Sequence, residues 1–497
     1  MTSKVTIKRL ATGVPGLDEV LGGGLPEFSF NLIAGTPGCG KTTLAHQIMF
    51  ALATPERPAI YFTVLGEPPL KMLRYQQQFD YFDGDAINHS VRFINLSEDA
   101  MTGDLDRVLK RIVDEVTLHS PGLVFVDSFR SVVFSSASGD NPHNNLQQFV
   151  QQLGTLMTSW QATTFLLGEY FNETDANPVF TIADGLIWLR QSVQRNSMVR
   201  KIEIMKMRGQ PTPPGLYTFR INNAGITVFA PARLALAEPD GAGPQPLTPR
   251  VMLGVPGLDA MLGGGLPRGY SVLVAGPSGS GKSILAAAYL AEGARNGETG
   301  VFAAFEQSPS RSHNRALIAL IDSGQIGLID SRAPDRSIDE VVGQLTTEIR
   351  RLKATRVVLD SLSGFELTLA PSFREDFRAS LLGLVSALTE SGVSVLMTSE
   401  LEDRYTDLRF SPYGAAFLTD AIIVQRYIEV ESRLLRVMAV VKVRASAHSN
   451  ELCLYTIDDD GIRMGEMLPN QEGLLGGRPT KQRAPDVPAA AKAASDA

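Results

Sequence analysis

The sequence predicts an α/β protein made of two tandem domains, each a mostly parallel sheet flanked by helices. Three observations support this fold class: a long internal repeat, apolar runs without polar alternation, and a glycine-rich loop between a strand and a helix in each repeat. A chain of 497 residues has room for two to four domains at about 100–200 residues each. The internal repeat indicates that there are two domains.

The internal repeat begins close to the N-terminus. Residues 13–26 read GVPGLDEVLGGGLP and return as residues 254–267, with twelve of the fourteen positions identical. The same spacing of 241 residues relates Lys41 to Lys282. Later matches drift by a few positions, as loop insertions and deletions produce: Asp127 with Asp360, Glu169 with Glu400, Asp184 with Asp420, Arg200 with Arg436, Lys206 with Lys442, and Arg208 with Arg444. A repeat of about 240 residues is a whole domain rather than a solenoid unit.

Composition shifts place the domain boundaries. We expect a first domain over residues 1–235, a linker over 236–250, a second domain over 251–466 and a tail over 467–497. The linker is dense in Pro and Gly, which sustain neither a helix nor a β-ladder. The tail is rich in Gly, Pro, Ala and Lys and has almost no large apolar residue after Leu475, so we expect it to be disordered.

Apolar runs predict the strands. Those of the first domain cover residues 28–34, 59–64, 122–127 and 163–167, and those of the second cover 270–275, 300–304, 356–360 and 393–397. Strands that lack polar alternation are buried on both faces, which is typical of a parallel sheet covered by helices. We expect a helix over residues 42–51, and sheet-edge or hairpin strands over 201–207 and 436–443.

Composition also excludes several classes of function. The net charge is −7 with a pI near 5.6, which disfavours a protein that binds nucleic acid by neutralising phosphates. Cys39 and Cys453 are the only cysteines, so a disulfide framework and a four-cysteine zinc site are excluded. No apolar run approaches the ~18 residues of a membrane-spanning helix, and the N-terminus lacks a signal peptide's apolar core. We therefore expect a soluble, cytoplasmic protein with neither nucleic acid nor membrane as partner.

Two loops fit the phosphate-binding pattern G-x-x-x-x-G-K-[ST]: residues 35–42 read GTPGCGKT and residues 276–283 read GPSGSGKS. Their glycines let backbone N–H groups converge on phosphate oxygens at the positive N-terminus of the following helix. We expect Lys41 and Lys282 to reach the β- and γ-phosphates of a nucleotide. The expected nucleotide-binding residues are Gly35, Thr36, Pro37, Gly38, Cys39, Gly40, Lys41, Thr42, Thr43, Gly276, Pro277, Ser278, Gly279, Ser280, Gly281, Lys282 and Ser283, with Lys206 and Lys442 from later strands.

Hydroxyl and carboxylate groups around these loops predict a magnesium site in each domain. Thr42 and Ser283 close the two loops and are suited to hold Mg²⁺. Asp127 and Asp360 end apolar runs, where P-loop enzymes place the carboxylate that orients the metal. The alternative for both aspartates is a simple strand-end cap, which their paired occurrence disfavours.

ATP hydrolysis also requires a group that orients water. Glu306 directly follows a predicted strand, and Glu67 follows the equivalent strand two positions out of register with it. The alternative for both is a solvated loop carboxylate.

Two later cation pairs, Lys206 with Arg208 and Lys442 with Arg444, each share one face of a strand, because side chains alternate with period two. A solvated face is the default interpretation of such a pair. In a ring of subunits, however, Arg208 and Arg444 are suited to project into a neighbour's nucleotide site as arginine fingers.

The repeated GVPGLDxxLGGGLP run, the VDS after a later strand and the late KMRG at residues 206–209 together resemble the KaiC family of circadian-clock ATPases. The resemblance covers roughly residues 10–465. It implies two RecA-like P-loop NTPase domains that bind ATP and Mg²⁺, assembled as a homo-hexameric double ring with ATP between subunits. It further implies slow ATP hydrolysis in the N-terminal ring, autokinase and autophosphatase activity in the C-terminal ring, and a signalling partner protein of unknown identity.

The chain departs from the clock members of that family at two places. They carry adjacent glutamates after the second strand, whereas here Glu306 is followed by Gln307 and the first copy retains only the shifted Glu67. They also present adjacent Ser-Thr phosphoacceptors, whereas Ala416 and Phe417 stand here and neither accepts a phosphoryl group.

Several functions remain open from the sequence. We expect foremost an ATP-hydrolysing hexamer with a nucleotide-driven signalling or clock-related output. The alternatives are a Ser/Thr autokinase with another acceptor, for which Ser411 and Thr419 lie nearby, and a non-catalytic ATP-gated scaffold. A RecA- or helicase-like motor on DNA is disfavoured by the acidic balance and by the absence of a basic stretch interleaved with aromatics.

Overall fold

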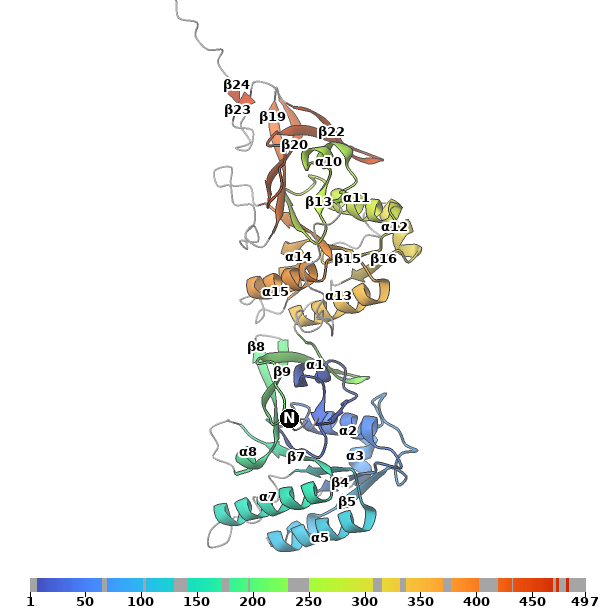
Figure 1. Ribbon diagram of the computed structural model, residues 1–497, viewed down its shortest axis with the longest axis vertical. Helices are drawn as coiled ribbons and strands as arrows, with labels where there is room; N and C mark the ends of the chain where they lie inside the picture. The colour runs from blue at the N-terminus through green and yellow to red at the C-terminus, as the bar shows by residue number, and fades with distance from the viewer. Residues whose placement is uncertain are drawn as a thin grey trace, which may run out of the picture. The chain divides into compact units, whose positions relative to one another are not determined.

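Each half of the chain forms an α/β unit of its own, Met1–Ala235 and Leu236–Ala497 (Figure 1). The computed structural model describes residues 7–64, 69–101, 104–128, 142–171, 178–194, 197–230, 250–306, 315–330, 337–369, 377–401, 419–430, 432–467, 471–472 and 480–481. None of the helices in these ranges combines the length and the apolar character that a membrane crossing requires.

In the described part of the first unit, nine strands form one sheet in the order β11-β10-β9-β8-β3-β7-β6-β4-β5. The strands from β8 to β5 run parallel, whereas β8 to β11 are antiparallel neighbours. The strands are β3 (Phe30–Gly35), β4 (Ala59–Thr63), β5 (Val91–Asn95), β6 (Leu123–Asp127), β7 (Thr163–Glu169), β8 (Gly185–Gln194), β9 (Ser197–Met207), β10 (Leu216–Asn222) and β11 (Gly225–Val228), with a separate pair β1 (Arg9–Leu10) and β2 (Leu25–Pro26).

The second unit repeats this topology in the order β16-β15-β17-β18-β14-β19-β20-β21-β22. Its strands are β14 (Ser271–Gly276), β15 (Gly300–Ala304), β16 (Ile326–Asp330), β17 (Arg356–Asp360), β18 (Ser394–Glu400), β19 (Ala421–Val430), β20 (Arg433–Val443), β21 (Cys453–Asp458) and β22 (Gly461–Met467), with the pair β12 (Arg250–Val251) and β13 (Leu266–Pro267). Within the predicted tail, β23 (Gln471–Glu472) pairs with β24 (Thr480–Lys481). Residues 236–249 of the predicted linker lie outside the described ranges.

Helices cover both faces of the first sheet because its inner strands are buried on both sides. All six residues of β3 are buried, with Ile33 in the core beside α2 and Leu32 in the core beside α5 and α7. Successive side chains of a strand alternate, so one apolar run supplies two layers. The helices are α1 (Leu17–Leu21), α2 (Lys41–Leu52), α3 (Pro69–Gln76), α4 (Ser97–Ala100), α5 (Leu105–His119), α7 (Pro142–Ser159) and α8 (Pro178–Ile182).

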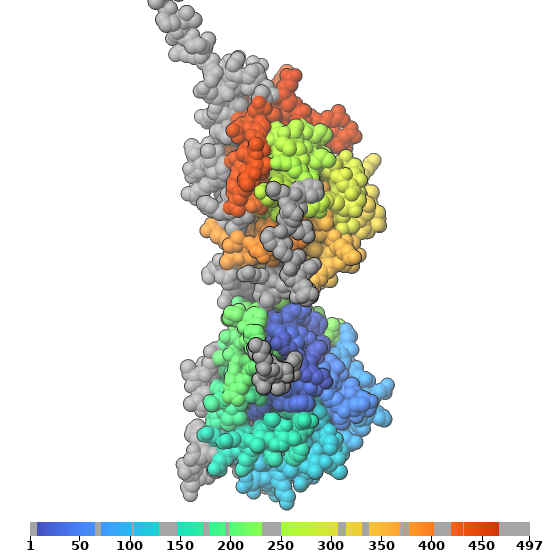
Figure 2. Space-filling model, viewed as in Figure 1, coloured from blue at the N-terminus to red at the C-terminus, as the bar shows by residue number. Residues whose placement is uncertain are grey.

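Helix α5 shows why these segments form helices where they do. The Asp104 side chain accepts hydrogen bonds from the backbone N–H groups of Asp106 and Arg107, which caps the first turn. Val108, Ile112 and Val116 recur every four residues and form the buried stripe. In Figure 2 the surfaces of α5 and α7 adjoin one another, and residues of both belong to a single core cluster.

The second sheet is covered in the same way, with α11 on one face and α13 and α15 on the other. Helix α13 begins with a reciprocal capping box between Ser337 and Glu340. The helices are α10 (Pro256–Met261), α11 (Lys282–Arg295), α12 (Arg315–Asp322), α13 (Ile338–Leu352), α14 (Leu362–Thr368) and α15 (Phe377–Glu390).

The predicted strands are confirmed, with ends shifted by no more than four residues. Strand β3 begins at Phe30 rather than Phe28, because Phe28 has a φ of 63° and the Ser29 hydroxyl turns back to the Pro26 carbonyl. The two late runs are hairpin strands, as expected. They are not sheet edges, because β10 and β21 pair with their outer sides.

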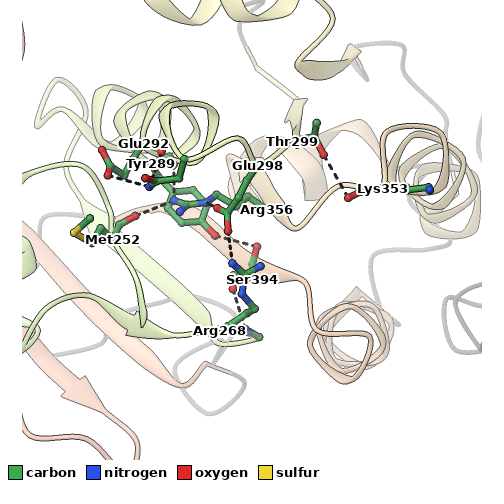
Figure 3. Close-up of polar contacts among 11 residues, drawn as sticks. Met252, Arg268, Tyr289, Glu292, Glu298, Thr299, Lys353, Arg356 and Ser394 are labelled. Atoms are coloured by element: carbon green, nitrogen blue, oxygen red, sulfur yellow. Dashed lines mark hydrogen bonds and ion pairs between the residues drawn. The ribbon is translucent and has the colours of Figure 1, made fainter. Parts of the chain in front are cut away.

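A buried ion network joins several segments of the second unit (Figure 3). Arg356, 2% exposed, donates to the Met252 and Tyr289 carbonyls at 2.8 Å each and lies over the Tyr289 ring. Its Nε donates to Glu298 at 2.5 Å, and Arg268 binds the other oxygen of that carboxylate. Burial alone would raise the pKa of Glu298, but the hydrogen bonds and charges of Arg356 and Arg268 lower it overall.

Replacing Glu298 is expected to weaken the second unit at neutral pH only. Glu298→Gln removes a paired carboxylate and lowers the free energy of unfolding by about 1–3 kcal/mol. Because the folded-state pKa is lowered, the stabilisation is complete above the carboxyl's usual value of 4.5 and is lost as the pH falls through the folded-state value. The difference between wild type and variant therefore shrinks on acidification. Urea unfolding at several pH values, read by hydrogen-exchange mass spectrometry of β17 peptides, measures it.

Glu348→Gln provides the matched control in the same unit. Glu348 pairs with Arg351 at 2.8 Å on the surface of α13, where the arginine side chain is 57% exposed. An exposed pair of this kind contributes about 0–1 kcal/mol. Equal losses for the two variants at pH 7 would contradict the role assigned to the buried network.

Candidate functional site

Both glycine-rich loops lie at the carboxyl edge of their parallel sheet, where β3 leads into α2 and β14 leads into α11. Gly38 and Gly40 have φ angles of 75° and 107°, and Gly279 and Gly281 have 75° and 99°. Side chains rarely tolerate this backbone conformation. A Cβ at Gly40 would also lie 2.8 Å from the side chain of Ile221. The loops therefore have the compact form that brings successive N–H groups together at a helix N-terminus.

The two loop lysines fold back over their own loops. Lys41 Nζ donates to the carbonyls of Gly35 at 3.1 Å and Thr36 at 2.9 Å. Lys282 Nζ donates to the equivalent carbonyls of Gly276 and Pro277 at 2.9 and 2.8 Å. Each loop thus places an ammonium group beside the N-terminus of a helix, and both attract an anion.

In the first unit a strand-end carboxylate meets the loop hydroxyl. Asp127 Oδ2 accepts hydrogen bonds from Thr42 Oγ1 at 3.0 Å and from Tyr61 OH at 2.7 Å. Burial raises the pKa of Asp127, an effect that the Tyr61 and Thr42 hydrogen bonds and the Lys41 charge partly offset and the Glu169 charge reinforces. A hydroxyl and a carboxylate in contact are hard oxygen ligands, so these residues fit Mg²⁺ held jointly with phosphate oxygens.

In the second unit the equivalent carboxylate has a different donor. Asp360 ends β17, and its Oδ1 accepts a hydrogen bond from Thr398 Oγ1 of β18. Ser283 follows Lys282 at the start of α11, but no hydrogen bond joins it to Asp360 in the described part of the unit. In both units the peptide bond after the aspartate is cis.

Three carboxylates lie near the lysine of the second loop. Burial lowers the pKa of Lys282, and the negative charges of Glu400, Asp360 and Glu306 act in the opposite direction. Glu306 accepts a hydrogen bond from Ser361 at the N-terminus of α14. The structure thus places the carboxylates of Glu306 and Asp360 where their charges act on Lys282. The predicted Glu67 lies outside the described residues.

The cation pairs Lys206 with Arg208 and Lys442 with Arg444 lie near the amino ends of the parallel strands, whereas the loops lie at the carboxyl ends. In the first unit, Lys206 donates to the Thr181 carbonyl at 3.0 Å and Arg208 to Asp184 at 3.2 Å. Strand β9 ends at Met207, which pairs with Gly185 at the start of β8. Gly185 in turn pairs with Asn31 of β3, four residues before Gly35 at the start of the loop. At about 3.3 Å per residue, that is a separation of about 13 Å along the strand.

The second unit repeats this arrangement. Lys442 donates to the Thr419 carbonyl at 2.8 Å and Arg444 to Asp420 at 3.4 Å. In both units the lysine pKa is lowered by burial and by the neighbouring arginine, while the aspartate raises it. In the first unit Lys206 and Arg208 both donate to the Thr181 carbonyl, so the two side chains reach the same segment.

Four residues near the sites were not predicted. Tyr61 and Thr398 lie inside apolar strands, where they are typical core residues, and only the fold shows that they donate to aspartates. Glu169 and Glu400 matched each other in the repeat, but the sequence assigned them no role. They end β7 and β18 beside Gly35 and Gly276, so the repeat itself was the signal that could have identified them.

The match to a known protein family shows to which family the chain belongs. A family model described as "ATPase: KaiC" matches residues 10–233 and again residues 251–468. The chain belongs to the KaiC family. The resemblance predicted from the sequence is thereby confirmed over both units, and the two KaiC matches coincide with the two RecA-like sheets.

Curated KaiC proteins match nearly the whole chain. The "Circadian clock oscillator protein KaiC" of Picosynechococcus sp. is 26% identical over 489 residues, which are 96% of this chain and 93% of that protein. The protein of the same name from Rippkaea orientalis is 25% identical over 96% of this chain and 92% of its own length. "Circadian clock oscillator protein KaiC 1" of Synechocystis sp. has the same identity and coverage. The chain is thus a divergent KaiC relative with full-length similarity.

Gly40→Ala tests the loop geometry. A side chain at a φ of 107° is strained and crowds Ile221, so the variant should lose about 1–3 kcal/mol of unfolding free energy and bind nucleotide more weakly. Trp160 and Trp188 are the only tryptophans and both belong to the first unit, so their fluorescence follows its unfolding.

Gly154→Ala is the matched control. Gly154 lies in α7, and a Cβ there would have ordinary contacts of 3.7 Å or more. The same substitution should leave stability unchanged or raise it by up to about 1 kcal/mol. A Gly40→Ala variant as stable as this control would contradict the strained-loop interpretation.

Proposed function

We propose that the chain is a Mg²⁺-dependent ATPase that works as a homo-hexamer with a nucleotide-driven signalling output. The observation that carries the proposal is the contact between the loop hydroxyl of Thr42 and the strand-end carboxylate of Asp127, beside Lys41. Together these groups supply the cation, the metal ligands and the anion-binding backbone that ATP requires. The second unit offers Lys282, Ser283 and Asp360 at the equivalent positions, with Thr398 rather than Ser283 as the donor to the aspartate.

Each unit divides the work among its own residues. The loop N–H groups and the helix N-terminus bind the triphosphate, with Lys41 or Lys282 exchanging its carbonyl partners for phosphate oxygens. The remaining loop residues expected to line these sites are Gly35, Thr36, Pro37, Gly38, Cys39, Gly40, Thr43, Gly276, Pro277, Ser278, Gly279, Ser280 and Gly281. Thr42 with Asp127, and Ser283 with Asp360, would hold Mg²⁺, which when bound neutralises charge on the phosphates.

Glu306 is the residue we assign to orient the attacking water in the second unit, and Glu67 is its counterpart in the first. Support for Glu306 is its position among the carboxylates around Lys282. Its hydrogen bond from Ser361 gives the carboxylate a defined orientation.

The position of the late cations favours an assembly. Lys206 with Arg208, and Lys442 with Arg444, lie near the edge opposite their own loop, so a role at a nucleotide must be at a neighbouring subunit's site. Arg208 and Arg444 would then stabilise charge developing on the transferred phosphate. Ring assembly satisfies this requirement for every subunit equally.

The output is inferred from the relatives. The curated proteins matched over 96% of the chain carry the name circadian clock oscillator protein, so we place the output in the same class of timing or signalling. Autophosphorylation receives less support. Ala416 and Phe417 lack hydroxyls, and Thr419 is fully buried. Ala416, Phe417 and the other candidate acceptor, Ser411, lie outside the described residues.

Replacing the loop lysines tests the proposal. Lys41→Ala and Lys282→Ala should each abolish ATP binding at one site, and the double variant should lose turnover entirely, because the ammonium group compensates phosphate charge. Phosphate release and equilibrium binding of ATP measure both effects. Wild-type turnover in the double variant would refute the assignment. ATP binding without turnover in the wild type would favour the non-catalytic scaffold, and label transferred from [γ-³²P]ATP to the chain would favour the autokinase.

Mixing two inactive variants tests catalysis between subunits. Arg208→Ala should lower turnover at the first site about 10³-fold while ATP still binds. Mixed with Lys41→Ala in a Lys282→Ala background, it should regain activity, because some mixed interfaces contain an intact loop and an intact arginine. Arg351→Ala, on the exposed surface of α13, serves as the control and should leave turnover unchanged. Failure of the mixture to exceed the sum of its parts would place Arg208 outside the neighbour's site.

A further inference from the structure

The two units supply their strand-end aspartates with hydrogen bonds from opposite sides. In the first unit the donor is Tyr61 of β4, and in the second it is Thr398 of β18. Strands β4 and β7 flank β6, just as β15 and β18 flank β17. Among the described residues, each carboxylate therefore accepts a side-chain hydrogen bond from one neighbouring strand and none from the other.

The pairing register shows that the two donors replace one another. Tyr61 lies two residues before Thr63, which pairs with Asp127, and Phe302 lies two residues before Ala304, which pairs with Asp360. Tyr61 and Phe302 are therefore equivalent.

On the other side, Asp127 pairs with Leu167, whose equivalent in β18 is Thr398. The first unit thus combines tyrosine with leucine, and the second combines phenylalanine with threonine.

The surroundings of Tyr61 are polar in the first unit only. The His46 ring of α2 lies 4.5 Å from the Tyr61 ring between centroids, with the two planes tilted by 34°, and Gln76 of α3 lies beside the imidazole. At the same 241-residue spacing, the second unit has only apolar residues: Ala287, Phe302 and Leu317. Burial lowers the pKa of His46 to about 3, with a smaller opposing effect of Gln76, so the ring is neutral at physiological pH.

The Tyr61 hydroxyl donates directly to the strand-end carboxylate. Its side chain is fully buried, and its hydroxyl donates to Asp127 Oδ2 at 2.7 Å, the same oxygen that accepts from Thr42 Oγ1 at 3.0 Å. Two donors on one oxygen, one from β4 and one from α2, restrict the orientation of the carboxylate.

We propose that Tyr61 is a positioning residue of the first nucleotide site, holding Asp127 in the orientation that binds Mg²⁺, and that Thr398 performs this task for Asp360 in the second. The inference rests on the proposed function, since it assigns Asp127 and Asp360 to the metal. Removing an outer partner of a metal-binding residue typically costs about 10- to 100-fold in metal affinity.

The test moves the donor from one strand to the other. In the full chain carrying Lys282→Ala, only the first site binds a fluorescent ATP analogue, and the Mg²⁺ concentration at half-maximal binding is measured. Tyr61→Phe should raise that midpoint about 10-fold. Adding Leu167→Thr, which recreates the donor of the second unit, should bring it back to within about 3-fold of the parent. A purely structural role for Tyr61 predicts no such rescue.

A second buried tyrosine of the first unit provides the matched control. Tyr217→Phe removes another buried hydroxyl of the same unit, one that donates to the Pro213 carbonyl, and should leave the midpoint unchanged. An unchanged midpoint in Tyr61→Phe would overturn the proposal. Should that variant unfold early by tryptophan fluorescence, the Leu167→Thr double variant decides: recovery of the midpoint supports the proposal and its failure overturns it.

The second unit allows the reciprocal experiment. In the Lys41→Ala chain, Thr398→Val should raise the Mg²⁺ midpoint and Phe302→Tyr should restore it. Failure of the proposed function has a separate signature: the parent chain would bind the analogue without any dependence on Mg²⁺ or on Lys41. A Mg²⁺-dependent parent whose midpoint ignores Tyr61 and Thr398 would refute only the positioning role.

Discussion

In each unit a partly buried carboxylate ends an inner strand, and its hydrogen bonds connect the elements around the phosphate loop. Asp127 loses hydration there, so it requires donors, and Thr42 at the start of α2 and Tyr61 in β4 provide them. One carboxylate therefore ties the helix after the loop to two strands of the sheet. The glycines of the loop then have a fixed frame on which to converge, and the ammonium of Lys41 lies within it. The second unit meets the same requirement through Asp360 and Thr398.

Most of the fold could be predicted because its information is local or repeated. The parallel strands are continuous apolar runs, and the duplicated GVPGLD segment shows that the chain contains two domains of the same kind. The outer strands were harder. Only Val91 of strand β5 is fully buried, and the strand carries Arg92 and Asn95, so its apolar signal is weak. The antiparallel additions β10, β11, β21 and β22 depend on pairing partners that periodicity does not identify.

In the candidate sites, too, the residues within one segment could be predicted and those from distant strands could not. Lysines, hydroxyls and aspartates of the loops follow from motifs, because phosphate binding demands fixed spacings within one segment. Tyr61, Thr398, Glu169 and Glu400 come from strands distant in sequence and meet the loops only through sheet register. A tyrosine in an apolar strand is typical of core packing, so no pattern distinguishes Tyr61 before its neighbours are known. The position of Lys206 and Arg208 on the far edge likewise required the hairpin's register.

The exchange of donors between the units also constrains how the duplicated halves diverged. An ancestor that lost its donor before gaining the other would have left a desolvated carboxylate short of a partner, at a cost of about 1–3 kcal/mol. Gaining the second hydroxyl first avoids that cost, since Asp127 has strands on both sides from which a donor can reach it. The permissive mutational order is therefore gain before loss, and reconstructed ancestral sequences should contain a domain with tyrosine and threonine together. This order takes the divergence of the two halves through a redundant state and avoids a deficient one.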